Sequence, residues 1–206
     1  MNFITGVYIF MFFCGIFLLL LFIILHNKNK KFLYEYLKPK RYPTVSFLTA
    51  AYNEEENIRN TIEALVRLEY PKGKKEIIVV NDGSEDNTAK IARELARKHK
   101  EVRLIDKKNS GKANSLNEAI KVAKGELIAV VDADSYPEED SLIKIVGYFD
   151  DEKVAAVTSR VLVKNKNNWL GRFQVLDYSI IAWTRKLLDF VDSVYVTNGP
   201  LSVYRK

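Results

Sequence analysis

The chain has 206 residues, and its 32 Lys and Arg exceed its 26 Asp and Glu, for a formal charge of +6 at pH 7. Its one cysteine, Cys14, excludes an intrachain disulfide and a zinc site built from cysteines. Kinase, dehydrogenase and P-loop functions lose their main support, because the sequence contains neither a Gly-x-Gly-x-x-Gly nor a Gly-x-x-x-x-Gly-Lys-Ser/Thr motif.

The N-terminal segment, from Phe3 to Leu25, carries no charged residue and is rich in Phe, Ile and Leu. As a helix it would span roughly 34 Å, enough to cross a hydrocarbon core of about 30 Å. A signal peptide fits poorly, because no Lys or Arg precedes the apolar run and no small-residue cleavage site follows it. We therefore expect one transmembrane helix over residues 1–27.

Residues 28–43 are expected to form a basic linker in which Glu35 is the single acid. Its cations are Lys28, Lys30, Lys31, Lys38, Lys40 and Arg41. By the positive-inside rule the N-terminus lies outside the cell membrane and the rest of the chain in the cytoplasm. The cluster would also attract anionic headgroups, so membrane lipids are expected partners. No nucleic-acid-binding motif accompanies it, and we expect no nucleic acid partner.

Residues 44–206 are expected to form one α/β domain with a mostly parallel sheet and helices on both faces. Apolar runs predict strands at 44–51, 76–80, 102–105, 127–131 and 154–163. Amphipathic patterns predict helices at 53–68, 88–100 and 112–123, one opening at Pro137 and a longer one from Trp169. Asn53 is the expected N-cap of the first of these helices, and the helix from Trp169 is expected to pack on the sheet. Strands that alternate with helices indicate βαβ units.

Four polar clusters follow the first four predicted strands. They are Tyr52-Asn53-Glu54, Asn81-Asp82-Gly83-Ser84, Asn109-Ser110-Gly111-Lys112, and the pair Asp132 and Asp134. Ligands of open α/β sheets bind outside the carboxyl ends of the strands, so the clusters are expected to share one site. Taken singly, several have a plainer interpretation: Asp82 as part of a capping loop, Lys112 as a solvated lysine, and Glu54 as a first-turn acid.

The pair Asp132 and Asp134 carries the most specific chemistry. Side chains alternate along an extended chain, so residues two apart can face the same side. Two carboxylates in this arrangement can hold Mg²⁺ or Mn²⁺ against a phosphate-bearing substrate. The sequence therefore favours an enzyme that acts on a nucleotide diphosphate.

The ordered motifs TAAYNEE (49–55), VNDGSEDNT (80–88), GKANSLN (111–117) and DADS (132–135) resemble the family 2 glycosyltransferases. The resemblance implies the GT-A fold and transfer of a sugar from a UDP-sugar, with inversion, to an acceptor hydroxyl. It also implies a donor site in which Asp82 contacts uracil, Lys112 lies near the base or diphosphate, and Asp134 ligates the metal. The full set of implied donor-binding residues is Ala51, Tyr52, Asn53, Glu54, Asp82, Lys112, Asp132 and Asp134.

The segment NGPLSVYR (198–205) is similar to the Gly-Pro-Leu-Ser segment of processive membrane synthases that make chitin, hyaluronan, cellulose or poly-N-acetylglucosamine. The resemblance implies a growing polysaccharide as acceptor and acceptor contacts from Asn198, Gly199 and Pro200. The family places its catalytic base in an acidic motif after this segment, so the base is expected beyond Lys206. We therefore expect residues 44–206 to be an incomplete transferase domain that binds donor but transfers sugar poorly. Transfer of one sugar to a lipid-linked acceptor and a non-catalytic nucleotide-sugar-binding fragment remain alternatives.

Overall fold

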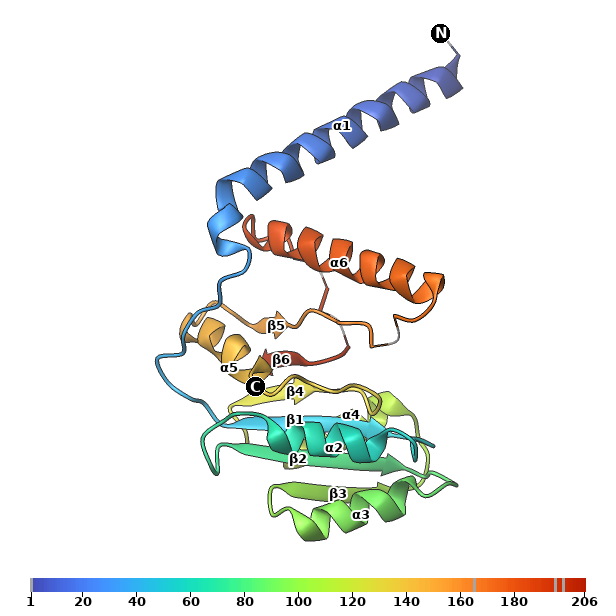
Figure 1. Cartoon of the computed structure of the whole chain (residues 1–206), viewed down its shortest axis with the longest axis vertical. Helices are drawn as coiled ribbons and strands as arrows, with labels where there is room; N and C mark the ends of the chain where they lie inside the picture. The colour runs from blue at the N-terminus through green and yellow to red at the C-terminus, as the bar shows by residue number, and fades with distance from the viewer. Residues whose placement is uncertain (1, 165, 195, 198) are drawn as a thin grey trace. The chain divides into compact units, whose positions relative to one another are not determined.

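The computed structural model describes residues 2–164, 166–194, 196–197 and 199–206 (Figure 1). The chain divides into two compact units. One comprises the N-terminal residues up to Glu35 together with Arg160–Val196, and the other comprises Tyr36–Ser159 together with Thr197–Lys206. The predicted division into residues 1–27, 28–43 and 44–206 follows membrane topology rather than compactness, and it stays a prediction.

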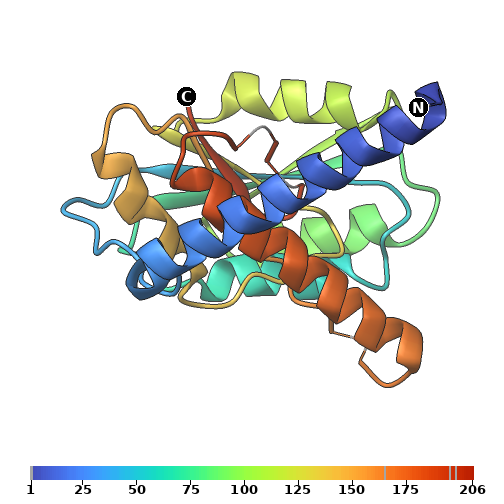
Figure 2. The same ribbon diagram turned by 90° about the horizontal axis from the view of Figure 1, so that it is seen from above.

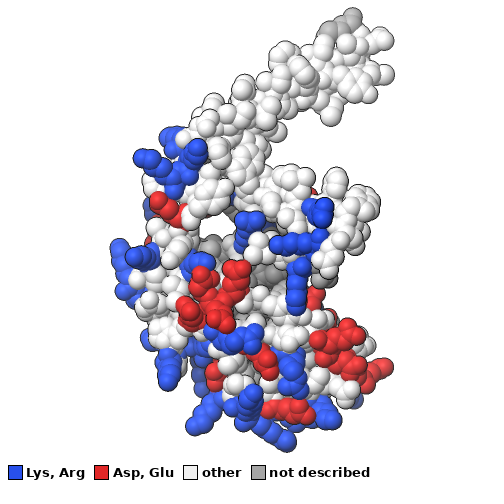
Figure 3. All heavy atoms as spheres, viewed as in Figure 1, with Lys and Arg blue, Asp and Glu red and all other residues white. Residues whose placement is uncertain are grey.

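The first unit contains the helices α1 (Phe3–Asn29) and α6 (Trp169–Asp189), with a short 3-10 turn η1 (Lys30–Phe32) after α1. Within the described residues, the helix that α1 forms with η1 is the one long and apolar enough to cross a membrane. Figure 3 shows no charged side chain along most of α1 and a group of Lys and Arg where it ends. The expected apolar N-terminal helix is therefore present.

Helix α6 packs against α1 in this unit. The rings of Trp183 and Phe22 lie 6.0 Å apart, and Trp183 Nε1 donates a hydrogen bond of 3.1 Å to His26 Nδ1. Several members of the apolar stripe that was expected to pack on the sheet are exposed, namely Leu170, Phe173, Leu176 and Ile180, whereas Leu187 is buried. The compact unit that contains α6 is the unit of α1, and packing of α6 on the sheet stays a prediction.

The second unit is built on one sheet with strand order β3-β2-β1-β4-β6-β5. Its strands are β1 (Val45–Ala51), β2 (Lys75–Asp82), β3 (Val102–Lys107), β4 (Leu127–Val130), β5 (Ala156–Thr158) and β6 (Ser202–Arg205). The pairs β1–β2, β2–β3 and β1–β4 are parallel, whereas β6 runs antiparallel to both β4 and β5. The prediction of a mostly parallel α/β sheet is confirmed.

Helices cover both faces of this sheet, as Figures 1 and 2 show. One face carries α2 (Ile58–Arg67), α3 (Thr88–Lys98) and α5 (Ser141–Val146), and α5 continues into the 3-10 turn η2 (Gly147–Asp150). The other face carries α4 (Lys112–Val122). Alternation along β1 explains the two cores: Phe47 packs in the first and Leu48 in the second, and both are fully buried.

Two helices begin later than the sequence predicts. Helix α2 starts at Ile58, because Asn53 adopts a left-handed conformation (φ 53°) and binds another loop, so it does not cap this helix. The backbone N–H of Asn53 donates to Ser84 Oγ (3.0 Å), and Asn53 Oδ1 accepts from the backbone N–H of Glu85 (2.9 Å).

Helix α5 starts at Ser141 and not at Pro137. The carbonyl of Glu139 accepts a 2.8 Å hydrogen bond from the backbone N–H of Glu69, which follows α2, and this bond ties the segment before Ser141 to the end of α2.

The third difference concerns the last predicted strand. The run 154–163 pairs only over Ala156–Thr158, opposite Ser202–Tyr204 of β6, and the chain passes into the other compact unit from Arg160. Strand β6 was not predicted, because its residues belong to the segment expected to contact the acceptor. It inserts between β4 and β5 and brings residues 199–201 to the end of the sheet where β4 ends.

Candidate functional site

A cavity of about 320 Å³ lies at the carboxyl ends of β1, β2 and β4. It is lined by Ala50, Ala51, Tyr52, Glu54, Asp82, Lys112, Asp132, Ala133 and Asp134. Every predicted donor-binding residue except Asn53 lines this cavity. The convergence follows from topology, because parallel strands that are neighbours end at the same edge of the sheet.

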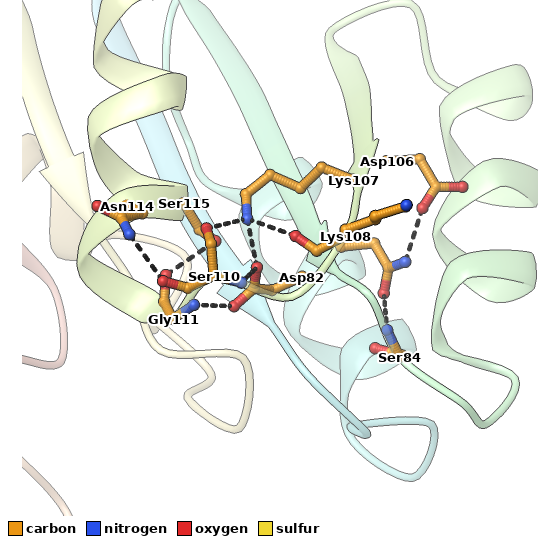
Figure 4. A network of polar contacts seen from close by, with 10 residues as sticks. Asp82, Ser84, Asp106, Lys107, Lys108, Ser110, Gly111, Asn114 and Ser115 are labelled. Carbon is orange, nitrogen blue, oxygen red and sulfur yellow. Dashed lines mark hydrogen bonds and ion pairs between the residues drawn. The ribbon is translucent and has the colours of Figure 1, made fainter.

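Asp82 is the last residue of β2 and lies buried beneath the loop that leads into α4 (Figure 4). Its carboxylate accepts hydrogen bonds from the backbone N–H groups of Ser110 (2.9 Å, to Oδ1) and Gly111 (2.8 Å, to Oδ2), and from Lys107 Nζ. Burial alone would raise the pKa of Asp82, but these hydrogen bonds, with one from the Ser115 hydroxyl, outweigh it and hold the pKa below the usual carboxyl range. In its ionised form, Asp82 therefore holds the loop 108–111 in place.

Lys107 is the functional residue that sequence reasoning missed. Its ammonium pairs with Asp82 and also donates to Ser110 Oγ (2.6 Å) and to the Lys108 carbonyl (3.0 Å), with only 12% of its side chain exposed. The available signal was strand register: Lys107 ends β3 directly opposite Asp82 at the end of β2. Opposite charges at the ends of neighbouring parallel strands can neutralise one another when both are buried.

The loops after β2 and β3 approach each other closely at Gly83. A Cβ atom there would lie 2.6 Å from the backbone nitrogen of Asn109, and the φ of Gly83 is +71°. Only glycine meets both conditions without strain. This contact places the loop 108–111 beside Asp82 and thereby positions the start of α4.

Lys112 is the first residue of α4 and contacts the carboxylate pair. Its Nζ lies 2.5 Å from Asp132 Oδ1, with 59% of the lysine side chain and 23% of the aspartate side chain exposed. Between the two carboxylates, Ala133 is buried and its carbonyl accepts a 2.6 Å hydrogen bond from Thr61 Oγ1 of α2. This bond ties the loop after β4 to α2, and both Asp132 and Asp134 line the cavity, as their spacing predicted.

The chemistry of the carboxylates fits a cation that is shared with a substrate. In the part of the chain that the structure describes, no group of three or more His, Cys, Asp or Glu side chains could hold a metal ion by itself. Mg²⁺ typically keeps waters and binds through one or two carboxylates together with substrate phosphates. Asp132 and Asp134 supply such a pair beside an open cavity.

The predicted acceptor segment lies next to Asp132, which lines the cavity. A Cβ atom on Gly199 would lie 3.1 Å from Asp132 Oδ2, so the backbone at this glycine lies against the carboxylate. The Pro200 carbonyl accepts from Ser159 Oγ (3.3 Å), which anchors the segment next to β5. The third residue of the prediction, Asn198, lies outside the described residues.

Comparison with known proteins identifies the family of this arrangement. The family described as Glycosyl transferase family 2 matches residues 46–206, which include every motif that lines the cavity. The chain belongs to glycosyl transferase family 2. The resemblance to family 2 inferred from the motifs is thereby confirmed.

Two relatives of this family 2 chain are poly-β-1,6-N-acetyl-D-glucosamine synthases. The protein from Staphylococcus epidermidis is 37% identical over 165 residues, and the protein from Staphylococcus aureus (strain COL) is 34% identical over 164. Each alignment covers 79% of this chain and 39% of the relative. The chain thus spans well under half the length of these synthases.

Solved structures with the same fold include a mannosyltransferase and a TarS fragment. A mannosyltransferase from Pyrobaculum calidifontis, in complex with GDP-Man and Mn²⁺, has a TM-score of 0.68 and 24% identity, covering 90% of this chain and 52% of its own. A Staphylococcus aureus TarS fragment in complex with UDP-GlcNAc has a TM-score of 0.55 and 26% identity, covering 61% of this chain and 36% of its own. The first likeness concerns the fold alone.

Proposed function

We propose that this chain is the donor-binding part of a membrane-anchored inverting glycosyltransferase that transfers sugar from a UDP-sugar to a growing polysaccharide. The observation that carries the proposal is the cavity at the strand ends, where Asp82, Lys112, Asp132 and Asp134 converge. The similarity to poly-β-1,6-N-acetyl-D-glucosamine synthases supports an N-acetylhexosamine polymer as product.

Within this proposal the cavity residues divide into three groups. Ala51, Tyr52 and Glu54 line the cavity and would border the uridine, together with Asn53, which contacts the loop after β2. Asp82 would contact uracil, and its carboxylate also holds the loop 108–111 in place.

Lys112, Asp132 and Asp134 would face the diphosphate. Asp134 would ligate Mg²⁺ or Mn²⁺, whose charge stabilises the departing UDP. A TarS fragment solved with UDP-GlcNAc and a mannosyltransferase solved with Mn²⁺ are consistent with both ligand classes.

The acceptor would approach from the side of Gly199 and Pro200, with Asn198 preceding them. This placement is supported by the contact of Gly199 with Asp132, because an acceptor hydroxyl must reach the sugar next to the diphosphate. A polysaccharide or a lipid-linked sugar would satisfy the same geometry.

A membrane location is supported by the first compact unit. Helix α1 is long and apolar enough to span a bilayer, and Lys28 and Lys30 lie at its end, so we propose that this end faces the cytoplasm. Helix α6 packs on α1 near His26 and leaves Phe173 and Ile180 exposed, which suits contact with lipid at the membrane surface.

Calorimetric titration of UDP into the full chain in detergent, with and without Mn²⁺, tests the proposal. We expect binding that strengthens with Mn²⁺ and weakens by roughly tenfold in Asp134→Ala, since a charged metal ligand is lost. Glu152→Ala removes an exposed acid that does not line the cavity and should bind like the parent. Failure of the parent chain to bind UDP would overturn the proposed function.

A further inference from the structure

We propose that Lys112 is an exchangeable counter-ion of Asp132. It competes with a divalent cation for this carboxylate and pairs with the diphosphate once the cation is bound. Cation and nucleotide would then bind cooperatively, each favouring the other. The inference rests on the proposed function and concerns the order and coupling of binding at the same site.

The ion pair between Lys112 and Asp132 can open readily. Its 2.5 Å contact joins a lysine side chain that is 59% exposed to a carboxylate that is 23% exposed. Exposed ion pairs contribute little to stability, and the lysine side chain is long and flexible. Within the described residues, Asp132 is the one hydrogen-bonding partner of the Lys112 ammonium.

Lys107 provides the contrast within the same site. Its ammonium is held by three acceptors, including the buried carboxylate of Asp82, and little of its side chain is exposed. Lys107 is therefore fixed as part of the framework. Of the two lysines, Lys112 is the one that lines the cavity and is free to change partner.

Electrostatic repulsion determines that Lys112 leaves Asp132 when a divalent cation binds there. A divalent cation bound by Asp132 and Asp134 would repel the ammonium of Lys112 at this separation. The displaced ammonium lies at the N-terminus of α4, where a phosphate group is also favoured by the exposed backbone N–H groups. The cation thus releases Lys112 for the diphosphate, and by linkage the diphosphate strengthens binding of the cation to the same degree.

The backbone at Gly199 limits where Asp132 can go during this exchange. It lies against Oδ2, while Lys112 contacts Oδ1. The aspartate is therefore held between the two segments, and the exchange moves the lysine instead.

The test measures Mn²⁺ binding alone by the EPR signal of free Mn²⁺, and UDP binding by calorimetry, on the full chain in detergent. In Lys112→Met, Mn²⁺ alone should bind about two- to fivefold more tightly, because its competitor for Asp132 is gone. UDP in the presence of Mn²⁺ should bind roughly tenfold more weakly, because a charged phosphate partner is gone. A merely structural lysine would not move the two affinities in opposite directions.

Two variants serve as controls. Lys153→Met removes the same charge from an exposed position that does not line the cavity, and it should leave Mn²⁺ affinity unchanged. Lys112→Arg keeps the positive charge of the side chain and should keep the coupling between Mn²⁺ binding and UDP binding. Unchanged or weaker Mn²⁺ binding by a folded Lys112→Met, with UDP binding intact in the parent, would overturn the exchange alone. A parent chain that binds no UDP would overturn the exchange and the proposed function together.

Discussion

Replacing Asp82 with asparagine perturbs the framework of the cavity at its most buried charge. Asparagine offers a single acceptor oxygen, whereas the carboxylate serves Lys107 and the backbone N–H groups of Ser110 and Gly111. At least one of these donors would face an NH₂ group, and Lys107 would lose its counter-charge. We expect the loop 108–111 to loosen and the domain to lose stability.

The expected loss follows from the burial of the pair. Removing one partner of a buried ion pair costs about 3–5 kcal/mol. Lys107 is 12% exposed and keeps two other acceptors, so the low end, about 3 kcal/mol, applies to Asp82→Asn. For a chain of this size that loss corresponds to a fall in Tm of about 6–12 °C.

Urea unfolding followed by circular dichroism measures the global loss, and hydrogen exchange of the amides of Ser110 and Gly111 measures the local one. Glu94→Gln is the matched control: it changes an exposed carboxylate paired with Arg59 and should cost less than about 1 kcal/mol. An Asp82→Asn variant as stable as the parent, with unchanged exchange at both amides, would refute this account of the loop.

The pH dependence carries a definite sign. Because the pKa of Asp82 in the folded protein lies below the ordinary carboxyl value of about 4, ionised Asp82 stabilises the fold. That contribution is fully present above pH 4 and is lost as the pH falls through the pKa of the folded state. The stability gap between parent and Asp82→Asn should therefore be constant near neutrality and shrink in acid.

Two glycines give further predictions. Gly147→Ala would place a Cβ atom 1.9 Å from the Leu37 carbonyl oxygen, so the backbone must move. We expect the free energy of unfolding, measured in urea, to fall by about 2–3 kcal/mol. A neutral effect would contradict the packing described. Gly199→Ala would bring a Cβ atom to 3.1 Å from Asp132 Oδ2. It should weaken Mn²⁺-dependent UDP binding a few-fold with little change in stability, and equal binding in calorimetry would argue against a role for this contact.

The strand ends explain how much of the site could be predicted from sequence. Asp82, Asp132 and Tyr52 each follow a buried apolar run, and parallel topology then forces them to one edge of the sheet. Local pattern was sufficient for these residues. It was insufficient for Lys107, whose contact with Asp82 depends on the register between β3 and β2, which the pattern of either strand alone does not give.

The remaining misses have a similar cause. Asn53 and Asn57 both precede the apolar pattern of α2. The helix starts at Ile58 because contacts with the segment after β2, among them those of Asn53, hold residues 53–55 outside the helix. Helix α6 is amphipathic, and an amphipathic pattern is the same whether the apolar face packs on a sheet or on a lipid surface. The pattern alone therefore does not decide between these two surroundings.

The central claim is that the cavity at the ends of β1, β2 and β4 holds UDP and a divalent cation. Anomalous diffraction from crystals of the full chain grown with UDP and Mn²⁺ would locate the metal directly. We predict a manganese peak bonded to Asp134, with UDP density beside Asp82 and Lys112. A manganese peak and UDP density at another place on the chain would contradict the account.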